Sequence, residues 1–145
     1  MKQPEYITSV EVRRVCRELK LRDWTKIRDG KVTAKEARTI LSMVNVEKMA
    51  IPLEEFRRGL EVELEHGCRF RDANVTNNHP LITGKIVLAH LKEMMDYYER
   101  LEVAELEGDL FKAVTSGNME KVKKYFRRLA KARTELNMLE GSKVG

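Results

Sequence analysis

The chain has 145 residues, of which 42% are apolar and 35% are charged, and its formal net charge is +5. This length and apolar content exclude an intrinsically disordered chain and favour one folded domain over residues 1–145. The two cysteines lack metal or redox spacing, and no apolar leader or membrane-spanning run is present, so the sequence favours a cytoplasmic protein without membrane association.

The first half of the chain contains three segments with helical periodicity. Ser9 is the expected N-cap of the first segment. Thr33 and Glu36 have the spacing of a capping box, which predicts the start of the second helix. The third helix begins at Leu53 and is expected to end at Gly67, which suits the position just after a helix.

The second half begins with a connection at residues 68–79, which is long for a loop between helices and therefore a candidate for function. A long helix is predicted for about residues 80–106, with Pro80 at its first position. After Gly108, a short helix is expected around residues 109–115. A last helix, about residues 119–140, should bury Val122, Phe126, Leu129 and Leu136.

No segment alternates with a period of two, so the sequence predicts an all-α protein. We expect a single compact bundle of five or six helices. The antiparallel pair formed by residues 53–66 and 80–106 should lie at its centre. The basic C-terminal helix completes the bundle.

Two mirrored spacings, Glu63-x-x-His66 and His90-x-x-Glu93, each place a carboxylate and an imidazole about one helical turn apart. In an antiparallel pair, the rotation of about 100° per residue allows both pairs to face the same side. Four such ligands would suit zinc, iron or manganese better than calcium. The alternative is a structural polar contact between the helices, in which His66 also interacts favourably with the helix dipole.

Three strings in the chain resemble a known family. They are FRRGLEVELEHG at residues 56–67, NVTN at residues 74–77 and TGKIVLAHLKEMMDYYERL at residues 83–101. They are similar to a family of small uncharacterised microbial and viral domains with F-x-x-G-x-x-V-E-L-E-H-G, N-V-T-N-D-D-P and K-I-A-L-A-H-L-x-E-x-P-D-Y-Y motifs. The resemblance covers about residues 34–102 and implies no known activity. It adds Asn74, Thr76, Asn77, Asp96 and Tyr97 to the candidate site residues.

The chain departs from this family pattern at two places. Asn78-His79-Pro80 replaces D-D-P, and His79 should cap a helix less well than aspartate. It could instead act as an extra ligand or as a pH-sensitive group. Met95 replaces a proline, which removes a kink and favours one unbroken helix.

The basic residues of the last helix lie opposite its apolar face. This surface could bind nucleic-acid phosphates or an acidic partner. However, residues 93–109 hold seven acids and one base, so the two segments could simply complement each other. The candidate residues are Lys121, Lys123, Lys124, Arg127, Arg128 and Lys131.

The sequence contains no glycine-rich phosphate loop, nucleophile elbow or Ser–His–Asp set, so it favours a non-catalytic protein. Two functions remain open. The first is an interaction module that binds a protein or nucleic acid through the basic helix. The second is a helical domain that binds a metal or another small ligand through Glu63, His66, His90 and Glu93.

Overall fold

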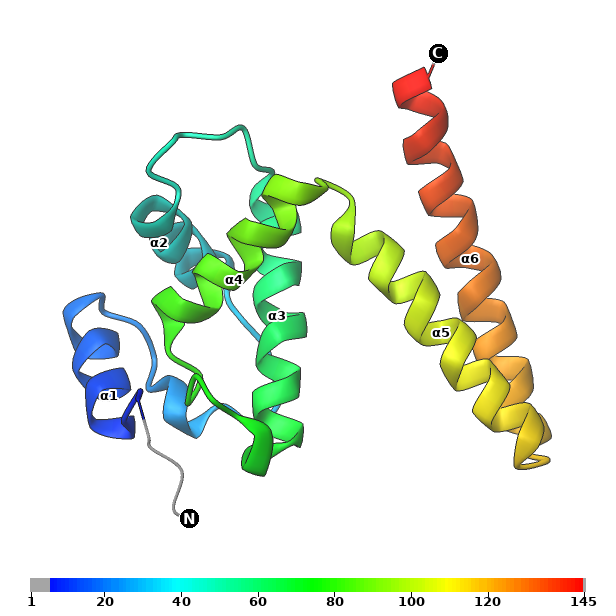
Figure 1. The fold of residues 1–145 in the computed structure, drawn as a ribbon, viewed down its shortest axis with the longest axis horizontal. Helices are drawn as coiled ribbons and strands as arrows, with labels where there is room; N and C mark the ends of the chain where they lie inside the picture. Colours follow the sequence, from blue (N-terminus) through cyan, green and yellow to red (C-terminus); the bar gives the residue numbers. More distant parts are fainter. Residues whose placement is uncertain (1–5, 145) are drawn as a thin grey trace. The chain divides into compact units, whose positions relative to one another are not determined.

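The computed structural model describes residues 6–144, which contain six α-helices, two 3₁₀ turns and no β-strand (Figure 1). The all-α fold class is therefore confirmed. The chain forms two compact units, one up to Met95 and one from Asp96 onward. The helices are α1 (Ser9–Glu18), α2 (Ala34–Val44), α3 (Leu53–Arg69), α4 (Pro80–Glu93), α5 (Tyr97–Thr115) and α6 (Met119–Val144), and the 3₁₀ turns are η1 (Trp24–Lys26) and η2 (Arg71–Ala73).

The first unit is organised around α4, which packs against α1, α2 and α3. Helices α3 and α4 pass each other in opposite directions (Figure 1). Gly84 allows the close approach of α4, because a Cβ at this position would lie 2.5 Å from Ile40 Cγ2 of α2. The largest fully buried side chains of this unit are Trp24, Phe56, Ile40, Leu60, Leu64, Leu91, Val12 and Val87.

A buried carboxylate connects the start of α2 to the segment before it. Glu36 is 4% exposed and closes the predicted capping box with Thr33. It also accepts hydrogen bonds from Trp24 Nε1 at 3.2 Å and from Arg22 Nε at 3.0 Å. Burial by itself raises the pKa of Glu36, but the hydrogen bonds from Arg22, Thr33 and Trp24 outweigh it and lower the pKa to about 2. Glu36 thus connects the N-terminus of α2 to Arg22 and Trp24, which lie 14 and 12 residues earlier in the chain.

The prediction of one unbroken helix over residues 80–106 is wrong, because α4 ends at Glu93 and α5 starts at Tyr97. Met94 between them has extended backbone angles, φ −151° and ψ 123°. The carboxylate of Asp96 accepts hydrogen bonds from Arg100 in the first turn of α5 and from Lys143 of α6. An acid at a helix N-terminus is stabilised by the helix dipole, so these interactions favour a new helix start at this point.

Other helix ends also differ from the predictions. Thr8, rather than Ser9, caps α1, since its hydroxyl accepts a hydrogen bond from Glu11 N. Helix α3 continues to Arg69, and Asn74 Nδ2 donates to the carbonyl of Gly67 at 3.1 Å. A side chain from the following loop thus satisfies a carbonyl of the last turn, and the helix does not stop at the glycine.

The second unit is an antiparallel hairpin of α5 and α6 (Figure 1). Helix α5 runs through Gly108 without a break, and α6 extends to Val144. Between them the chain turns at Gly117, whose φ of +68° suits glycine. The buried cluster that joins the helices contains Leu106, Leu129 and Ala132, with Val103, Leu110 and Tyr125 packed against it.

Phe126 was predicted to be buried, but its exposed fraction is 63%. The line of contact between the helices follows Leu129 and Ala132, and Phe126 falls to one side of it. Charged residues also join the two helices: Arg133 lies 2.6 Å from Glu107, Arg100 2.8 Å from Glu140, and Arg128 3.9 Å from Glu102. Acidic α5 and basic α6 therefore do complement each other at these positions.

Candidate functional site

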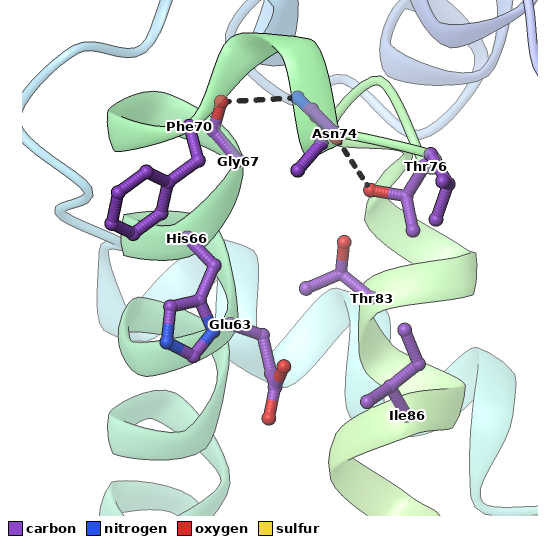
Figure 2. A pocket seen from close by; sticks show the side chains of 10 residues that line it. Glu63, His66, Gly67, Phe70, Asn74, Thr76, Thr83 and Ile86 are labelled. Atoms are coloured by element: carbon purple, nitrogen blue, oxygen red, sulfur yellow. Dashed lines mark hydrogen bonds between the residues drawn. The ribbon is translucent and has the colours of Figure 1, made fainter.

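A pocket of about 340 Å³ lies in the first unit, between the C-terminal half of α3, the N-terminal half of α4 and the loop that joins them (Figure 2). Glu63 and His66 line it from α3, and Thr83 and Ile86 line it from α4. The two residues of each pair are three positions apart in the sequence, so they lie on the same face of their helix. The remaining lining residues come from the end of α3 and from the loop: Gly67, Phe70, Ala73, Asn74, Val75 and Thr76.

The roof of the pocket is a hydrogen-bonded loop. Asn74 Nδ2 donates to Gly67 O at 3.1 Å and to Asn78 Oδ1 at 2.9 Å. Thr76 Oγ1 donates to Asn74 Oδ1 at 3.2 Å (Figure 2). Asn77 and Asn78 have φ angles of 47° and 59°, in the left-handed region that asparagine tolerates better than most residues. These hydrogen bonds explain why asparagine and threonine recur in this string.

Gly67 allows the loop to close over the end of α3. A Cβ at this position would overlap Asn78 Oδ1 and would lie 2.9 Å from Asn74 Nδ2. Any larger residue would therefore displace the two amides that hold the loop. Asn77 Nδ2 donates to Ile7 O, which ties the same loop to the segment before α1. The predicted site residues Asn74, Thr76 and Asn77 thus shape the pocket by holding its roof.

The two mirrored pairs meet only in part. Glu63 Oε1 lies 3.7 Å from His90 Nε2, so one residue of each pair forms the contact between α3 and α4. Their side chains are 17% and 29% exposed. His66 lies beside Glu63 in the pocket wall, and Glu93 is exposed at the end of α4. Within residues 6–144, no three His, Cys, Asp or Glu side chains are grouped closely enough to hold a metal ion.

His79, considered above as an extra ligand, caps α4. Its Nδ1 accepts a hydrogen bond from Ile82 N at 3.4 Å, and the residue is 6% exposed. Burial lowers the pKa of His79, while the nearby Glu11 carboxylate partly opposes this effect and Arg14 reinforces it. The cap requires an unprotonated Nδ1, so both the hydrogen bond and the burial favour the neutral imidazole in the folded state.

Acidification is therefore expected to destabilise the protein through His79. As the pH falls below the unfolded value of 6.5, the unfolded chain takes up a proton first, and stability is lost until the pH reaches the lower folded pKa. Replacing His79 with Asn keeps a capping side chain and should remove this loss. Urea unfolding monitored between about pH 7 and about pH 5 measures the effect.

The matched control is His66→Asn, which changes an exposed imidazole and should leave the pH dependence intact. If His79→Asn loses as much stability on acidification as the wild type, protonation of His79 is not the cause.

Two further candidates lie in the second unit. Asp96 is 6% exposed and binds Arg100 and Lys143, and Arg100 is the main cause that lowers the pKa of Asp96. The ring of Tyr97 packs edge-on against that of Tyr98, with 5.1 Å between the centroids. The contact with Lys143 connects the start of α5 to the end of α6. The contacts of Asp96 with Arg100 and of Tyr97 with Tyr98 lie within the first turn of α5.

The basic residues of α6 fall into two groups. Arg128 and Arg133 form salt bridges with acids of α5. Arg128 was one of the candidates from the sequence and Arg133 was not. The remaining candidates are exposed, and binding of a partner through them stays a prediction. They are Lys121, Lys123, Lys124, Arg127 and Lys131.

Sequence reasoning missed several lining residues. Phe70 and Ile86 form apolar parts of the wall, and Thr83 contributes a hydroxyl from a residue that is 3% exposed. Thr83 and Ile86 precede His90 by seven and four residues, so helical spacing alone could have placed them on the same face. No local signal could have identified Phe70, because its position depends on how the loop folds over α3.

The fold and the pocket together define a small all-α domain with a ligand-sized pocket between two antiparallel helices. Within the described residues, no helix has the length and apolar character needed to cross a membrane. The chain belongs to the family described as "Protein of unknown function (DUF5661)", whose model matches residues 12–107. The match is wider than the 34–102 expected, and it ends inside α5, before the basic helix. No similarity to a curated protein or to a solved structure was found.

Proposed function

We propose that the protein binds a small organic ligand in the pocket between α3, α4 and their connecting loop. The observation that supports this proposal is a pocket of about 340 Å³ that brings together Glu63, His66, Asn74 and Thr76. This volume falls in the range of about 300 to 1,000 Å³ that small-molecule sites occupy. Binding is proposed without catalysis, because the lining residues contain no recognisable nucleophile activated by a base.

The lining chemistry indicates the kind of ligand. Glu63 provides a carboxylate that is 17% exposed, and no lysine or arginine lines the pocket. Phe70 and Ile86 provide apolar surface. A carboxylate of low exposure interacts most strongly with a charged hydrogen-bond donor and repels an anion. The proposed ligand is therefore a small amine whose remaining part is apolar.

Benzylamine and benzoate test this proposal, because they share a ring and differ in the sign of their charge. Benzylamine is expected to shift the backbone amide resonances of His66, Gly67 and Asn74 in NMR titrations, and benzoate is not. Glu63→Gln should weaken benzylamine binding by about tenfold, since the charge-assisted hydrogen bond is lost.

The matched control is Glu65→Gln on the same helix, because the Glu65 side chain is 66% exposed and pairs with Arg69. This variant should bind benzylamine as the wild type does. Equal binding of benzylamine and benzoate, or shifts that cluster away from the pocket, would contradict the proposal.

A further inference from the structure

The hairpin of α5 and α6 carries large apolar side chains on one exposed side. On α5, Phe111 and Val114 are 69% and 57% exposed, and on α6, Met119 and Phe126 are each 63% exposed. Large apolar side chains that are exposed and contiguous often mark an interaction surface. We call these four residues the hairpin patch.

A salt bridge shows that the four residues lie on the same side of the hairpin. On α5, Glu107 precedes Phe111 by four residues and Val114 by seven, so the three share a face. On α6, Met119, Phe126 and Arg133 are spaced by seven residues and share a face as well. Arg133 lies 2.6 Å from Glu107, which places the two faces next to each other.

The core of the hairpin is small for its length. Two helices of 19 and 26 residues share a buried cluster of Leu106, Leu129 and Ala132, and the other buried residues of the pair are Tyr98 and Ala113. Units of about this size usually need oligomerisation, a metal or disulfides to be stable. Both cysteines of the chain, Cys16 and Cys68, lie in the other unit. Covering the hairpin patch would bury further apolar side chains of the hairpin.

The charges of the two helices indicate what covers the patch. Helix α5 has five acids and two bases, and α6 has eight bases and three acids. In a second hairpin placed on the first by a two-fold axis, α5 of one copy can lie against α6 of the other. Opposite charges then face each other at both contacts, and the patch meets its own equivalent.

We propose that the hairpin patch is a dimer interface and that two copies of this chain form a four-helix bundle through it. Burial of the apolar residues of the patch stabilises the dimer. The opposite charges of α5 and α6 favour the crosswise arrangement, in which α5 of each copy lies against α6 of the other. A two-fold symmetric contact of this kind is the commonest form of homo-oligomer.

Sedimentation equilibrium of the full chain over a concentration series tests the proposal. The wild type is expected to have the mass of two chains at micromolar concentration. Phe126→Glu and Phe111→Glu should each raise the dimer Kd by at least about tenfold, since each would bury an unpaired charge. Phe126→Gln, which adds no charge, should raise the Kd in the same direction. Far-UV circular dichroism should show unchanged helix content, because both positions are exposed.

The control is Val10→Glu on α1, which places the same charge at a position that is 66% exposed in the other unit. It should leave the Kd unchanged. A wild type that stays monomeric even at high micromolar concentration overturns the proposal, and so does a dimer whose Kd is the same in Phe126→Glu. A Kd that does not rise with salt overturns the crosswise arrangement.

Discussion

Replacing Glu36 with alanine is expected to lower the free energy of unfolding by about 3 kcal/mol. The variant leaves the buried Trp24 Nε1 without its acceptor and removes the partner of Arg22. It also removes half of the capping box with Thr33. The side chain of Arg22 is 48% exposed, so the loss belongs at the lower end of the range for buried ion pairs.

The same contacts make the stability depend on pH. The pKa of Glu36 falls from 4.5 to about 2 on folding, which corresponds to about 3 kcal/mol. Because the pKa is lowered in the folded state, this stability is present above pH 4.5 and is lost as the pH falls towards 2. In Glu36→Gln, this acid-induced loss should be absent.

Urea unfolding followed by fluorescence measures both effects, because Trp24 is the single tryptophan and is fully buried. Glu65→Ala is the matched control, since its side chain is 66% exposed and should contribute less than about 0.5 kcal/mol. If Glu36→Ala and Glu65→Ala unfold at the same urea concentration, the buried cluster does not stabilise the fold as described.

The second large effect is expected for Gly84→Val, which should destabilise the first unit by about 3 kcal/mol. A Cβ at Gly84 would lie 2.5 Å from Ile40 Cγ2, 3.4 Å from Val44 Cγ1 and 3.5 Å from Phe56 Cζ. The methyl of Ile40 is attached directly to its Cβ, and an isoleucine in a helix has one strongly preferred χ1 rotamer, so rotating this methyl away from the new side chain is costly. Valine would therefore push α4 away from α2 and α3.

Gly108→Val is the matched control, because it places the same side chain at a glycine in mid-helix with no atom within 4 Å. This variant should leave the free energy of unfolding unchanged or raise it by about a few tenths of a kcal/mol, which is the difference in helix propensity between glycine and valine. Urea unfolding distinguishes the two variants, with Trp24 fluorescence reporting on the first unit and far-UV circular dichroism reporting on both units. Equal midpoints for Gly84→Val and wild type would show that the contact between α4 and α2 relaxes at little cost.

The capping box of Thr33 and Glu36 and the start of α4 at Pro80 could be predicted from the sequence. A cap depends on residues three positions apart, and proline restricts its own backbone, so both signals are local. The all-α fold class follows from periodicity for the same reason. The further bonds of Glu36 with Arg22 and Trp24 carried no such signal, because those residues lie 14 and 12 positions away.

In the candidate site, too, features within one helix could be predicted from the sequence and contacts between segments could not. Helical spacing correctly indicated that Glu63 and His66 share a face, and the structure places both in the wall of one pocket. Spacing alone could not determine register between helices, and the structure brings His90 to Glu63 while Glu93 lies exposed at the end of α4. The roof of the pocket depends on Asn74 reaching back to Gly67, a contact that exists only once the loop has folded.

Predictions from residue type and helical periodicity were wrong at two places where contacts between helices act against them. The residue before Asp96-Tyr97 is methionine rather than proline, so the sequence favoured a continuous helix, yet Arg100 and Lys143 bind Asp96 at a new helix start. Likewise, the periodicity of α6 placed Phe126 on the apolar face, but α5 contacts Leu129 and Ala132 and leaves Phe126 exposed. Turns, caps and periodicity act within one segment and can be predicted from it. The choice of which side chains meet across segments depends on the packing of whole helices, which only the tertiary structure determines.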